Sequence, residues 1–431
     1  MPTAAYHTLG CKVNQYDTQA MEELLSAAGY STVPFSGEAD VYLVNTCTVT
    51  GTGDKKSLQT VRRLRREHPG SKIILCGCLA QLRGNELLST GADLILGTQY
   101  RGKIVSLLAQ VIRDGHPLCA VRPLGLHPAY ENLQISHQSD HTRAVLKIQE
   151  GCENRCSYCV IPQVRGPIRS RPLPDILEEA ARLAASGFRE IVLTGIHLSS
   201  YGRDLLSTAS LTDVIHSLQA MDGIYRIRLG SLEPTIATPD FVRAIRDADK
   251  VCPQFHLALQ SGSDSVLRRM RRRYNTSQYL KAVNEIRAGF PHSALTTDIL
   301  TGFPGETEAE FRETADFIRQ VGFARIHVFP YSPRPNTDAA ALPDQLPDAL
   351  RQERARQLIS IGEDTAQLYR KSWLNLVTEI LPEEFVNGCM EGYTPEYLRI
   401  RLPVGCRCTP GIPLRIRIVS ADQPTMRGEI V

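Results

Sequence analysis

Two long stretches of the chain alternate short apolar strands with amphipathic helices, and this alternation limits the possible fold more than any other feature of the sequence. The first stretch spans residues 1–115 and the second spans residues 142–362. Strands separated by helical segments indicate parallel sheets. We therefore expect an α/β protein with two parallel-sheet domains. In such sheets, ligands bind at the carboxyl ends of the strands.

The first stretch predicts a Rossmann-like domain. One helix is expected between Asp17 and Ala28, because apolar residues recur at helical spacing and Gly29 follows as a stop signal. The expected strands are short apolar runs, namely Tyr6–Leu9, Val41–Val44, Ile73–Leu75 and Leu94–Leu96. Residues 116–141 contain several proline and polar residues and are expected to form a linker.

The second stretch predicts a (β/α)6 partial barrel, because it contains six strand-and-helix units where a closed barrel of this kind has eight. The six expected strands are Ala144–Ile148, Glu190–Leu193, Tyr225–Leu229, Phe255–Leu259, Ala294–Leu300 and Arg325–Phe329. Residues 370–431 differ, because their expected strands are joined by turns that contain glycine and proline, which predicts a small all-β barrel. The expected strands of this last part are Leu374–Leu381, Leu398–Leu402 and Leu414–Val419.

Composition limits where the protein works and what it binds. The formal net charge is only +3, so contact with a polyanion must come from local basic patches. No apolar run approaches the roughly 18–20 residues that span a bilayer, and residues 1–9 lack the pattern of a signal peptide. We therefore expect a cytoplasmic protein with no membrane contact. Twelve cysteines in such a chain favour metal or redox use over disulfide bonds.

One group of cysteines is closely spaced. Cys152, Cys156 and Cys159 form a Cys-x3-Cys-x2-Cys pattern directly after the first expected barrel strand. Thiolates are soft ligands suited to iron–sulfur clusters or zinc. A four-iron cluster normally takes four thiolates, so three would leave one iron open. The pattern therefore favours an open iron–sulfur cluster, and the alternatives are a zinc site closed by a distant ligand or three buried structural cysteines.

This spacing, with an aromatic residue directly before the third cysteine, resembles the signature of the radical-SAM superfamily. The resemblance implies that the open iron binds S-adenosylmethionine (SAM), whose cleavage yields a 5′-deoxyadenosyl radical. Further segments resemble one branch of that superfamily, the methylthiotransferases. They are residues 159–171, 193–197, 232–234, 260–263 and 301–307. The resemblance covers the whole chain, including an N-terminal domain with its own cysteines and a C-terminal domain similar to TRAM modules.

The opening segment narrows the resemblance to a subfamily. Residues 9–17, which contain the run Cys-Lys-Val-Asn, are similar to the MtaB type, and so are residues 196–202. This type acts on N6-threonylcarbamoyladenosine beside the anticodon of tRNA and adds a methylthio group at carbon 2. The MiaB type, which acts on isopentenyladenosine, and the RimO type, which acts on a ribosomal-protein aspartate, are alternatives. A radical-SAM enzyme of another reaction and an iron–sulfur RNA-binding protein without catalysis are more distant alternatives.

The N-terminal stretch contains its own set of cysteines. Cys11, Cys47 and Cys78 each follow an expected strand, and the loops at one edge of a parallel sheet converge. The resemblance implies that these three bind a second 4Fe–4S cluster, which holds the sulfur that reaches the product. Cys76 lies two residues from Cys78 and is the competing ligand. We choose Cys78 because residues 77–81 match the family motif, and we expect Cys76 to be a core residue.

Several residues of the partial barrel are candidates for binding SAM. They are Tyr158, Gly195, Ser231, Glu233, Gln260 and Asp298. Glu233 and Gln260 lie at or just past strand ends, where barrel active sites form, and suit ribose hydroxyls and the methionine moiety respectively. Tyr158 is placed to pack against adenine, and the resemblance puts Gly195 at the glycine-containing strand end that binds SAM. Helix capping, loop solvation or core packing are the alternative roles of these side chains.

Two basic clusters and the C-terminal barrel are candidates for RNA contact. Residues 55–72 contain seven Lys or Arg side chains and one acid, and residues 268–273 contain five Arg. Such clusters suit phosphates, although a solvated helix face is an equal alternative, and Arg272 alternatively belongs to the SAM or cluster site. Small β-barrels bind single-stranded loops through aromatic and basic groups. The candidates in this barrel are Tyr393, Tyr397, Arg399 and Arg401.

The resemblance also implies partners for the reaction. Two SAM molecules are used, one as methyl donor and one as the source of the radical. The substrate is a tRNA, and the electron comes from a donor such as flavodoxin or ferredoxin. We expect the protein to act as a monomer.

Overall fold

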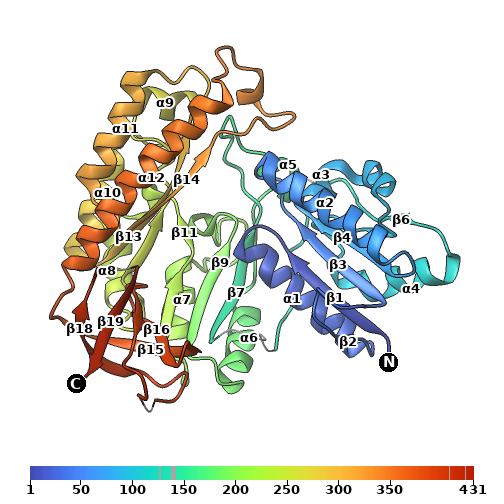
Figure 1. Cartoon of the computed structure of the whole chain (residues 1–431), viewed down its shortest axis with the longest axis horizontal. Helices are drawn as coiled ribbons and strands as arrows, with labels where there is room; N and C mark the ends of the chain where they lie inside the picture. Colours follow the sequence, from blue (N-terminus) through green and yellow to red (C-terminus); the bar gives the residue numbers. More distant parts are fainter. Residues whose placement is uncertain (126–127, 137–141, 407, 423) are drawn as a thin grey trace.

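The computed structural model describes residues 1–125, 128–136, 142–406, 408–422 and 424–431. Three parts follow one another along the chain, and they form the blue-to-cyan, green-to-orange and red portions of the ribbon in Figure 1. The predicted α/β class is confirmed, as are a parallel-sheet first part, an α/β second part and a small β-barrel at the end. In the described part of the chain, no helix has the length and apolarity to span a membrane.

The first part is built on a six-stranded parallel sheet in the order β2-β1-β3-β4-β5-β6. Its strands are β1 (Thr3–Thr8), β2 (Ser31–Thr32), β3 (Val41–Thr46), β4 (Lys72–Gly77), β5 (Leu94–Ile95) and β6 (Leu118–Cys119). Its helices are α1 (Lys12–Ala27), α2 (Gly51–Glu67), α3 (Cys78–Arg83) and α4 (Ile104–Asp114), with 3₁₀ turns at Gly84–Thr90 and Arg101–Lys103. Two apolar clusters cover the two faces of the sheet, which explains why its strands are almost wholly apolar. The sheet continues past residue 115, because β6 pairs with β5.

The second part contains the six parallel strands that the sequence predicts, and two further strands of two residues each, β8 (Arg169–Ser170) and β11 (Ser231–Leu232). The six strands are β7 (Arg143–Glu150), β9 (Glu190–Gly195), β10 (Arg226–Leu229), β12 (Gln254–Leu257), β13 (Ala294–Thr301) and β14 (Arg325–Pro330). They form the arrays β10-β9-β7-β8 and β11-β12-β13-β14, which a parallel bridge between Ile227 and Val251 connects. Among the strands that the structure describes, β14 does not pair with β7, so the barrel stays open on that side.

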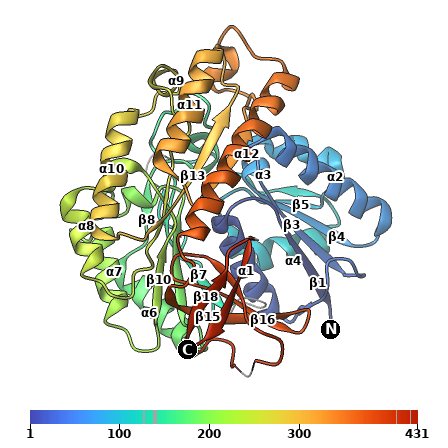
Figure 2. The ribbon, with the colours of Figure 1, turned by 60° about the vertical axis from the view of Figure 1, so that its left-hand side comes forward.

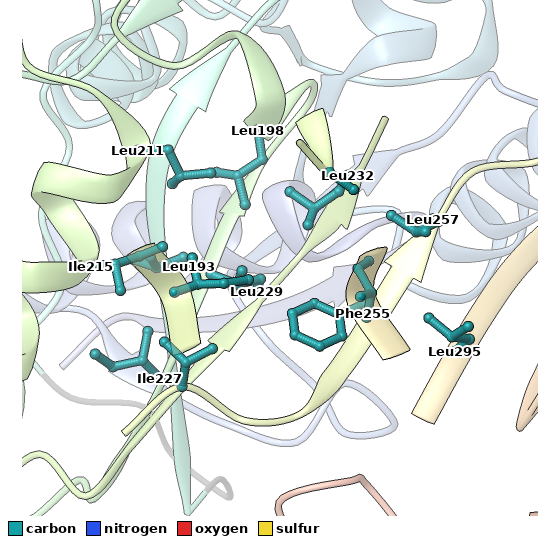
Figure 3. Close-up of a cluster of buried hydrophobic side chains, with 14 of the residues drawn as sticks. Leu193, Leu198, Leu211, Ile215, Ile227, Leu229, Leu232, Phe255, Leu257 and Leu295 are labelled. Atoms are coloured by element: carbon teal, nitrogen blue, oxygen red, sulfur yellow. The ribbon is translucent and has the colours of Figure 1, made fainter. Parts of the chain in front are cut away.

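Helices cover the outer side of these strands. They are α6 (Leu173–Ala185), α7 (Leu211–Gln219), α8 (Pro239–Arg246), α9 (Asp264–Arg269), α10 (Thr276–Gly289), α11 (Glu308–Val321) and α12 (Asp348–Lys371), with 3₁₀ turns at Leu198–Ser200, Pro234–Ile236 and Asp338–Ala341. The short helix α5 (Ile161–Arg165) instead packs against α3 of the first part. Leu193, Leu229 and Phe255, from β9, β10 and β12, share one apolar cluster with Ile215 of α7 (Figure 3). All four side chains are buried. Because the apolar side chains face the helices, the alternate positions of each strand are left to line the interior of the open barrel.

The third part is a closed five-stranded barrel in the order β15-β16-β17-β19-β18. Its strands are β15 (Val377–Val386), β16 (Cys389–Tyr393), β17 (Arg399–Arg401), β18 (Leu414–Ser420) and β19 (Thr425–Ile430). The prediction missed β16 and β19, whose short sequences mix charged, glycine and apolar residues and show no apolar run. The strand expected from Leu374 begins three residues later, because α12 runs to Lys371 and a turn follows it. Figure 2 shows this barrel in red beneath the other two parts.

A cluster of buried charges joins the first part to the second. Asp17 of α1 accepts a hydrogen bond from Lys147 of β7 at 2.6 Å and also pairs with Arg101 and Arg165. Glu150, at the end of β7, pairs with the same three cations. Burial alone would raise the pKa of both carboxyls. The three cations lower the pKa by more than burial raises it, so both pKa values lie below the ordinary range. The first and second parts are therefore held together by ionised side chains that are buried away from solvent.

Replacing Glu150 by Gln is expected to lower the midpoint of thermal unfolding, because three buried cations then share one carboxylate fewer. Removing one partner of a buried ion pair typically costs about 3–5 kcal/mol. The matched control is Glu178→Gln, since Glu178 pairs with Arg182 on an exposed helix face and its loss should cost less than about 1 kcal/mol. Equal midpoints for the two variants in scanning calorimetry would contradict the importance of the buried cluster.

Candidate active site

The three closely spaced cysteines lie in the loop that leaves the carboxyl end of β7. Gly151 begins this loop with a φ of +76°, and a Cβ atom there would lie 1.8 Å from a backbone carbonyl oxygen, so only glycine fits. The backbone N–H of Cys159 donates to the carbonyl of Cys156 at 3.1 Å, which tightens the loop. As a result, Cys152, Cys156 and Cys159 line one cavity of about 150 Å³.

A polar network faces the same cavity. Glu233, which follows β11, accepts hydrogen bonds on Oε1 from Asn154 Nδ2 and Arg272 Nη2, both at 3.2 Å. Its other oxygen, Oε2, lies 3.2 Å from His197 Nε2. Arg272 Nη1 also donates to Cys156 Sγ at 3.1 Å. Four loops from different strands and helices therefore present one carboxylate, one imidazole, one amide and one guanidinium to the three sulfurs.

Electrostatics set the protonation of these groups. Burial raises the pKa of Glu233, but the hydrogen bond with His197 and the charge of Arg272 lower it more, so the carboxyl stays ionised. Burial raises the pKa of Cys152 to about 11 and that of Cys159 to about 12. Such thiols keep their protons unless a cation lies beside them, and a coordinated metal ion deprotonates a thiol outright. The donor set therefore fits a metal–thiolate site.

The structure brings some of the predicted SAM-binding residues to this cavity. Tyr158, Ser231 and Glu233 line it together with the cysteines. Gly195 is the last residue of β9 and directly precedes Ile196 and His197, which line the cavity as well. Their shared location follows from the arrangement of parallel strands, whose carboxyl ends meet at one edge.

Gln260 and Asp298 are not among the residues that line the cavity. Asp298 lies in the interior of the open barrel, with its Oδ2 atom 3.3 Å from His256 Nε2. Gln260 has a φ of +69°, and its backbone N–H donates to Asp298 O at 2.9 Å. Gln260 and Asp298 thus lie next to each other but outside the cysteine cavity, and their contacts with SAM stay predictions.

Asn154 was not selected from the sequence, and His197 was noted only as part of a motif. Asn154 lies between Cys152 and Cys156, so its place inside the cysteine pattern was the available signal. His197 lies two residues past the end of β9, where a polar side chain enters the site. For His197, its position just past a strand end is therefore a better signal of a site residue than its residue type.

Cys11, Cys47 and Cys78 lie together at one edge of the first sheet. Cys11 precedes α1, Cys47 follows β3, and Cys78 begins α3 directly after β4. A Cβ atom on Gly10 would lie 3.2 Å from Cys47 Sγ, which shows how closely the first two loops approach. Burial, and to a lesser degree the nearby Cys78 and Cys11 thiols, raise the pKa of Cys47 to about 11. The structure thus brings together the three cysteines that the sequence analysis grouped.

Cys76 occupies a different environment. It is fully buried in β4, within an apolar cluster that includes side chains of α1 and α4, and its Sγ donates to Val44 O at 3.7 Å. Cys78 instead packs against Val160 and Val164 of the second part. Cys76 lies within the strand, whereas Cys78 follows the chain reversal at Gly77, whose φ is +93°, and this turn separates Cys76 from the set of three.

The two cysteine sets are close neighbours, because helix α5 lies between them. This helix has five residues, which is about 7.5 Å of length, and it begins two residues after Cys159. Its last residue, Arg165, is fully buried and donates from Nε to Cys78 Sγ at 3.2 Å. Arg165 also belongs to the buried charge cluster, so the same side chain connects the two domains and the second cysteine set.

The two predicted basic clusters differ in the structure. On α2, a groove of about 700 Å³ is lined by four basic side chains, Lys56, Arg62, Arg63 and Arg66. In residues 268–273 the arginines diverge instead. Arg269 pairs with Glu310 at 2.8 Å, Arg271 pairs with an aspartate, and Arg272 points into the cysteine cavity. The α2 side chains thus share one groove, in which Arg63 and Arg66 also pair with Glu67.

The predicted RNA-binding residues of the third part separate into two pairs. Tyr393 and Tyr397 stack with ring centroids 4.7 Å apart and an interplanar angle of 25°. Arg399 and Arg401 both pair with Glu391, at 2.5 and 2.6 Å, which neutralises part of their charge. The two tyrosine rings are also covered by cations, because the guanidinium of Arg143 lies 4.7 Å from the Tyr393 centroid and that of Arg228 lies 4.6 Å from the Tyr397 centroid. The RNA contacts of both pairs stay predictions.

Both cysteine sets fit an iron–sulfur cluster that is bound by three thiolates and leaves one iron for another ligand. Within the described residues, no three His, Cys, Asp or Glu side chains converge on one point as ligands of a single metal ion would, whereas the three thiolates of a four-iron cluster each bind a different iron.

Comparison with known proteins agrees with this chemistry. Residues 146–318 match the model of the radical SAM superfamily, and residues 3–97 match a model described as uncharacterized protein family UPF0004. A threonylcarbamoyladenosine tRNA methylthiotransferase MtaB of Bacillus subtilis is 39% identical over 100% of this chain and 97% of its own length. The MtaB of Thermotoga maritima is 36% identical over 98% of this chain and 96% of its own length. The chain belongs to the MtaB-type methylthiotransferase family.

Other relatives place this MtaB-type chain among related enzymes. A tRNA-2-methylthio-N(6)-dimethylallyladenosine synthase of Pelotomaculum thermopropionicum is 34% identical over 87% of this chain and 85% of its own length. Among solved structures, a radical S-adenosylmethionine methyltransferase, TsrM, of Kitasatospora setae, with cobalamin and a [4Fe-4S] cluster bound, covers 79% of this chain and 74% of its own. Its TM-score is 0.60 at 14% identity, which shows a shared fold. Membership in a radical-SAM family implies SAM and 4Fe–4S chemistry.

Replacing Cys78 by Ala is expected to remove about half of the iron that the reconstituted protein holds, because one cysteine set then has two thiolates. The matched control is Cys76→Ala, which should keep the full iron content, since Cys76 packs in the apolar core of the sheet. Iron analysis with Mössbauer spectroscopy measures both variants. Loss of iron in the Cys76 variant but not in the Cys78 variant would reverse the assignment.

Proposed function

We propose that this chain converts N6-threonylcarbamoyladenosine beside the anticodon of tRNA into its 2-methylthio derivative. The observation that supports this most strongly is the proximity of two cysteine sets, which the single short helix α5 separates. A reaction that both activates a carbon and delivers sulfur to it needs two such sites within reach of one base. Similarity to MtaB enzymes along the whole chain supports the choice of substrate.

The cysteines are proposed as the cluster ligands. Cys152, Cys156 and Cys159 would bind the cluster of the SAM site, while the ligands of the second cluster would be Cys11, Cys47 and Cys78. When bound, the clusters and SAM supply a 5′-deoxyadenosyl radical and a methylated sulfur for insertion at carbon 2 of the adenine. The protein supplies alignment and the exclusion of water and oxygen.

Side chains around the first set are proposed to hold SAM. Glu233 stays ionised and faces the cavity, so it is suited to accept hydrogen bonds from ribose hydroxyls. Tyr158 lines the same cavity and offers a ring face to adenine. Arg272 donates both to Glu233 and to Cys156 Sγ, and thereby fixes the carboxylate relative to the sulfur. Gly195 and Ser231 complete this proposed set, and Gln260 and Asp298 would contact SAM only from deeper in the barrel.

The partners follow from the proposed reaction. The substrate is a tRNA, for which the basic groove on α2 and the C-terminal barrel, residues 370–431, offer surfaces. Cleavage of SAM consumes one electron, so we propose a low-potential carrier such as flavodoxin or ferredoxin. We also propose that the protein works as a monomer in the cytoplasm, where its tRNA substrate is found.

The two cluster sites are expected to be separable by mutation. Cys156→Ala should abolish reductive cleavage of SAM, because two thiolates hold a cluster poorly, and should leave the iron of the other site in place. Cys47→Ala should still cleave SAM, because the barrel cysteines are untouched, but should form no methylthio product. Chromatography of 5′-deoxyadenosine and of tRNA nucleosides measures both steps. Continued 5′-deoxyadenosine production by the Cys156 variant would overturn the assignment of the SAM site.

The substrate assignment is tested with three tRNAs that carry unmodified adenosine, isopentenyladenosine or threonylcarbamoyladenosine. Reduced enzyme with SAM is expected to methylthiolate the threonylcarbamoylated tRNA preferentially. A charge-assisted hydrogen bond to the added carboxylate corresponds to about one to two powers of ten in selectivity. Mass spectrometry of the nucleosides gives the result. Preference for the isopentenylated tRNA would refute the substrate while leaving the enzyme class intact.

A further inference from the structure

A cavity of about 750 Å³ lies where all three parts of the chain meet. Lys12 and Gln15 of α1 line it from the first part, and Arg143 and Arg228 line it from the open side and interior of the barrel. The C-terminal barrel contributes several side chains, including Tyr393 and Tyr397, which belong to the stacked aromatic pair. None of the residues that line the SAM site lines this cavity.

The cations of this cavity differ in how they are compensated. Arg143 pairs with Glu383 at 2.9 Å, and its guanidinium also lies over the Tyr393 ring at 4.7 Å from the centroid. Arg228 pairs with Glu190 at 2.7 Å. Both arginines therefore have a carboxylate partner, although Glu190 also lies 3.8 Å from Arg226.

Lys12 is the uncompensated cation. It makes no hydrogen bond or ion pair with any residue that the structure describes, and its side chain remains exposed to the cavity. The second carboxylate that lines the cavity, Glu384, pairs with Arg399 at 3.0 Å and does not neutralise Lys12. The cavity therefore has an excess positive charge at Lys12, which suits an anionic group.

Lys12 also has a defined position relative to the proposed sulfur site, because it directly follows Cys11. In adenine, carbon 2 and the N6 substituent flank N1 on the same edge of the ring. A base whose carbon 2 faces the cysteine set thus presents its N6 substituent only a few bonds further along that edge. The threonylcarbamoyl group ends in a carboxylate, which matches the chemistry of the uncompensated ammonium.

We propose that Lys12 binds the carboxylate of the threonylcarbamoyl group and thereby selects the modified adenosine, with Gln15 and the two arginines lining the same subsite. This inference rests on the proposed function and names the residue that recognises its substrate. The interaction is a charge-assisted hydrogen bond, and its loss corresponds to a change in affinity of about ten- to hundredfold. An RNA without the carboxylate forgoes the interaction.

The test is fluorescence anisotropy with anticodon stem-loop RNAs and the full-length, cluster-reconstituted protein. Three RNAs carry adenosine, threonylcarbamoyladenosine or its neutral methyl ester at the target position. The wild-type protein should bind the acid about ten- to hundredfold more tightly than the ester. Lys12→Met should bind acid and ester equally and keep the wild-type affinity for the unmodified RNA, whereas Lys12→Arg should retain the preference for the acid.

The matched control is Lys103→Met, which removes the same charge from an exposed position of the same part that does not line the cavity. It should preserve the ratio of acid to ester affinity. An unchanged ratio in Lys12→Met would overturn the inference, and so would equal weakening of all three RNAs, which would identify Lys12 as a phosphate contact. Failure of the wild-type enzyme to methylthiolate the threonylcarbamoylated RNA would instead refute the proposed function, and the affinity ratio would still report on the carboxylate subsite.

Discussion

The relative position of the two cysteine sets depends on the buried ion cluster between α1 and β7. Asp17 lies six residues after Cys11, and Glu150 lies two residues before Cys152, so each carboxylate is tied to one set through a short piece of chain. Three shared cations then hold the two carboxylates together. Such a cluster adds little net stability, because desolvation offsets the attraction of the charges. The cluster instead fixes the position of α1 relative to β7, because each cation must contact both carboxylates at once.

Buried cations also contact the sulfur atoms of the two cysteine sets. Arg165 donates to Cys78 Sγ and Arg272 donates to Cys156 Sγ, so each cysteine set has one sulfur held by a largely buried guanidinium. Hydrogen bonds from charged donors stabilise thiolates and orient metal ligands. Arg165 joins the buried ion cluster as well, and Arg272 joins the network around Glu233. The contacts that fix the domains and those that fix the sulfurs are therefore parts of one continuous polar system.

Much of the fold and of the two cysteine sets could be predicted from the sequence, because most strands are visible as apolar runs and the site residues directly follow them. Cys47 and Cys152 each come just after such a run, and parallel strands bring their ends together. The C-terminal barrel was harder, since β16 and β19 mix charged, glycine and apolar residues and show no apolar run. The partners of Arg165 lie 15 to 151 residues away along the chain, so no local spacing reveals its role. Pairings over such distances depend on tertiary packing, which periodicity does not report.

With the proposed roles of Cys11 and Lys12, the start of α1 would couple substrate recognition to sulfur delivery. Cys11 and Lys12 are adjacent, so any displacement of the helix start moves the proposed sulfur ligand and the uncompensated ammonium together. Asn14 holds this start in place, because its Nδ2 donates to Leu9 O at 2.8 Å and to Thr46 O at 3.0 Å. Its Oδ1 accepts from Arg165, which links the helix start to the ion cluster. The distance between N6, which carries the threonylcarbamoyl group, and carbon 2 is fixed by the adenine ring, and a rigid helix start is the simplest protein counterpart of such a fixed distance.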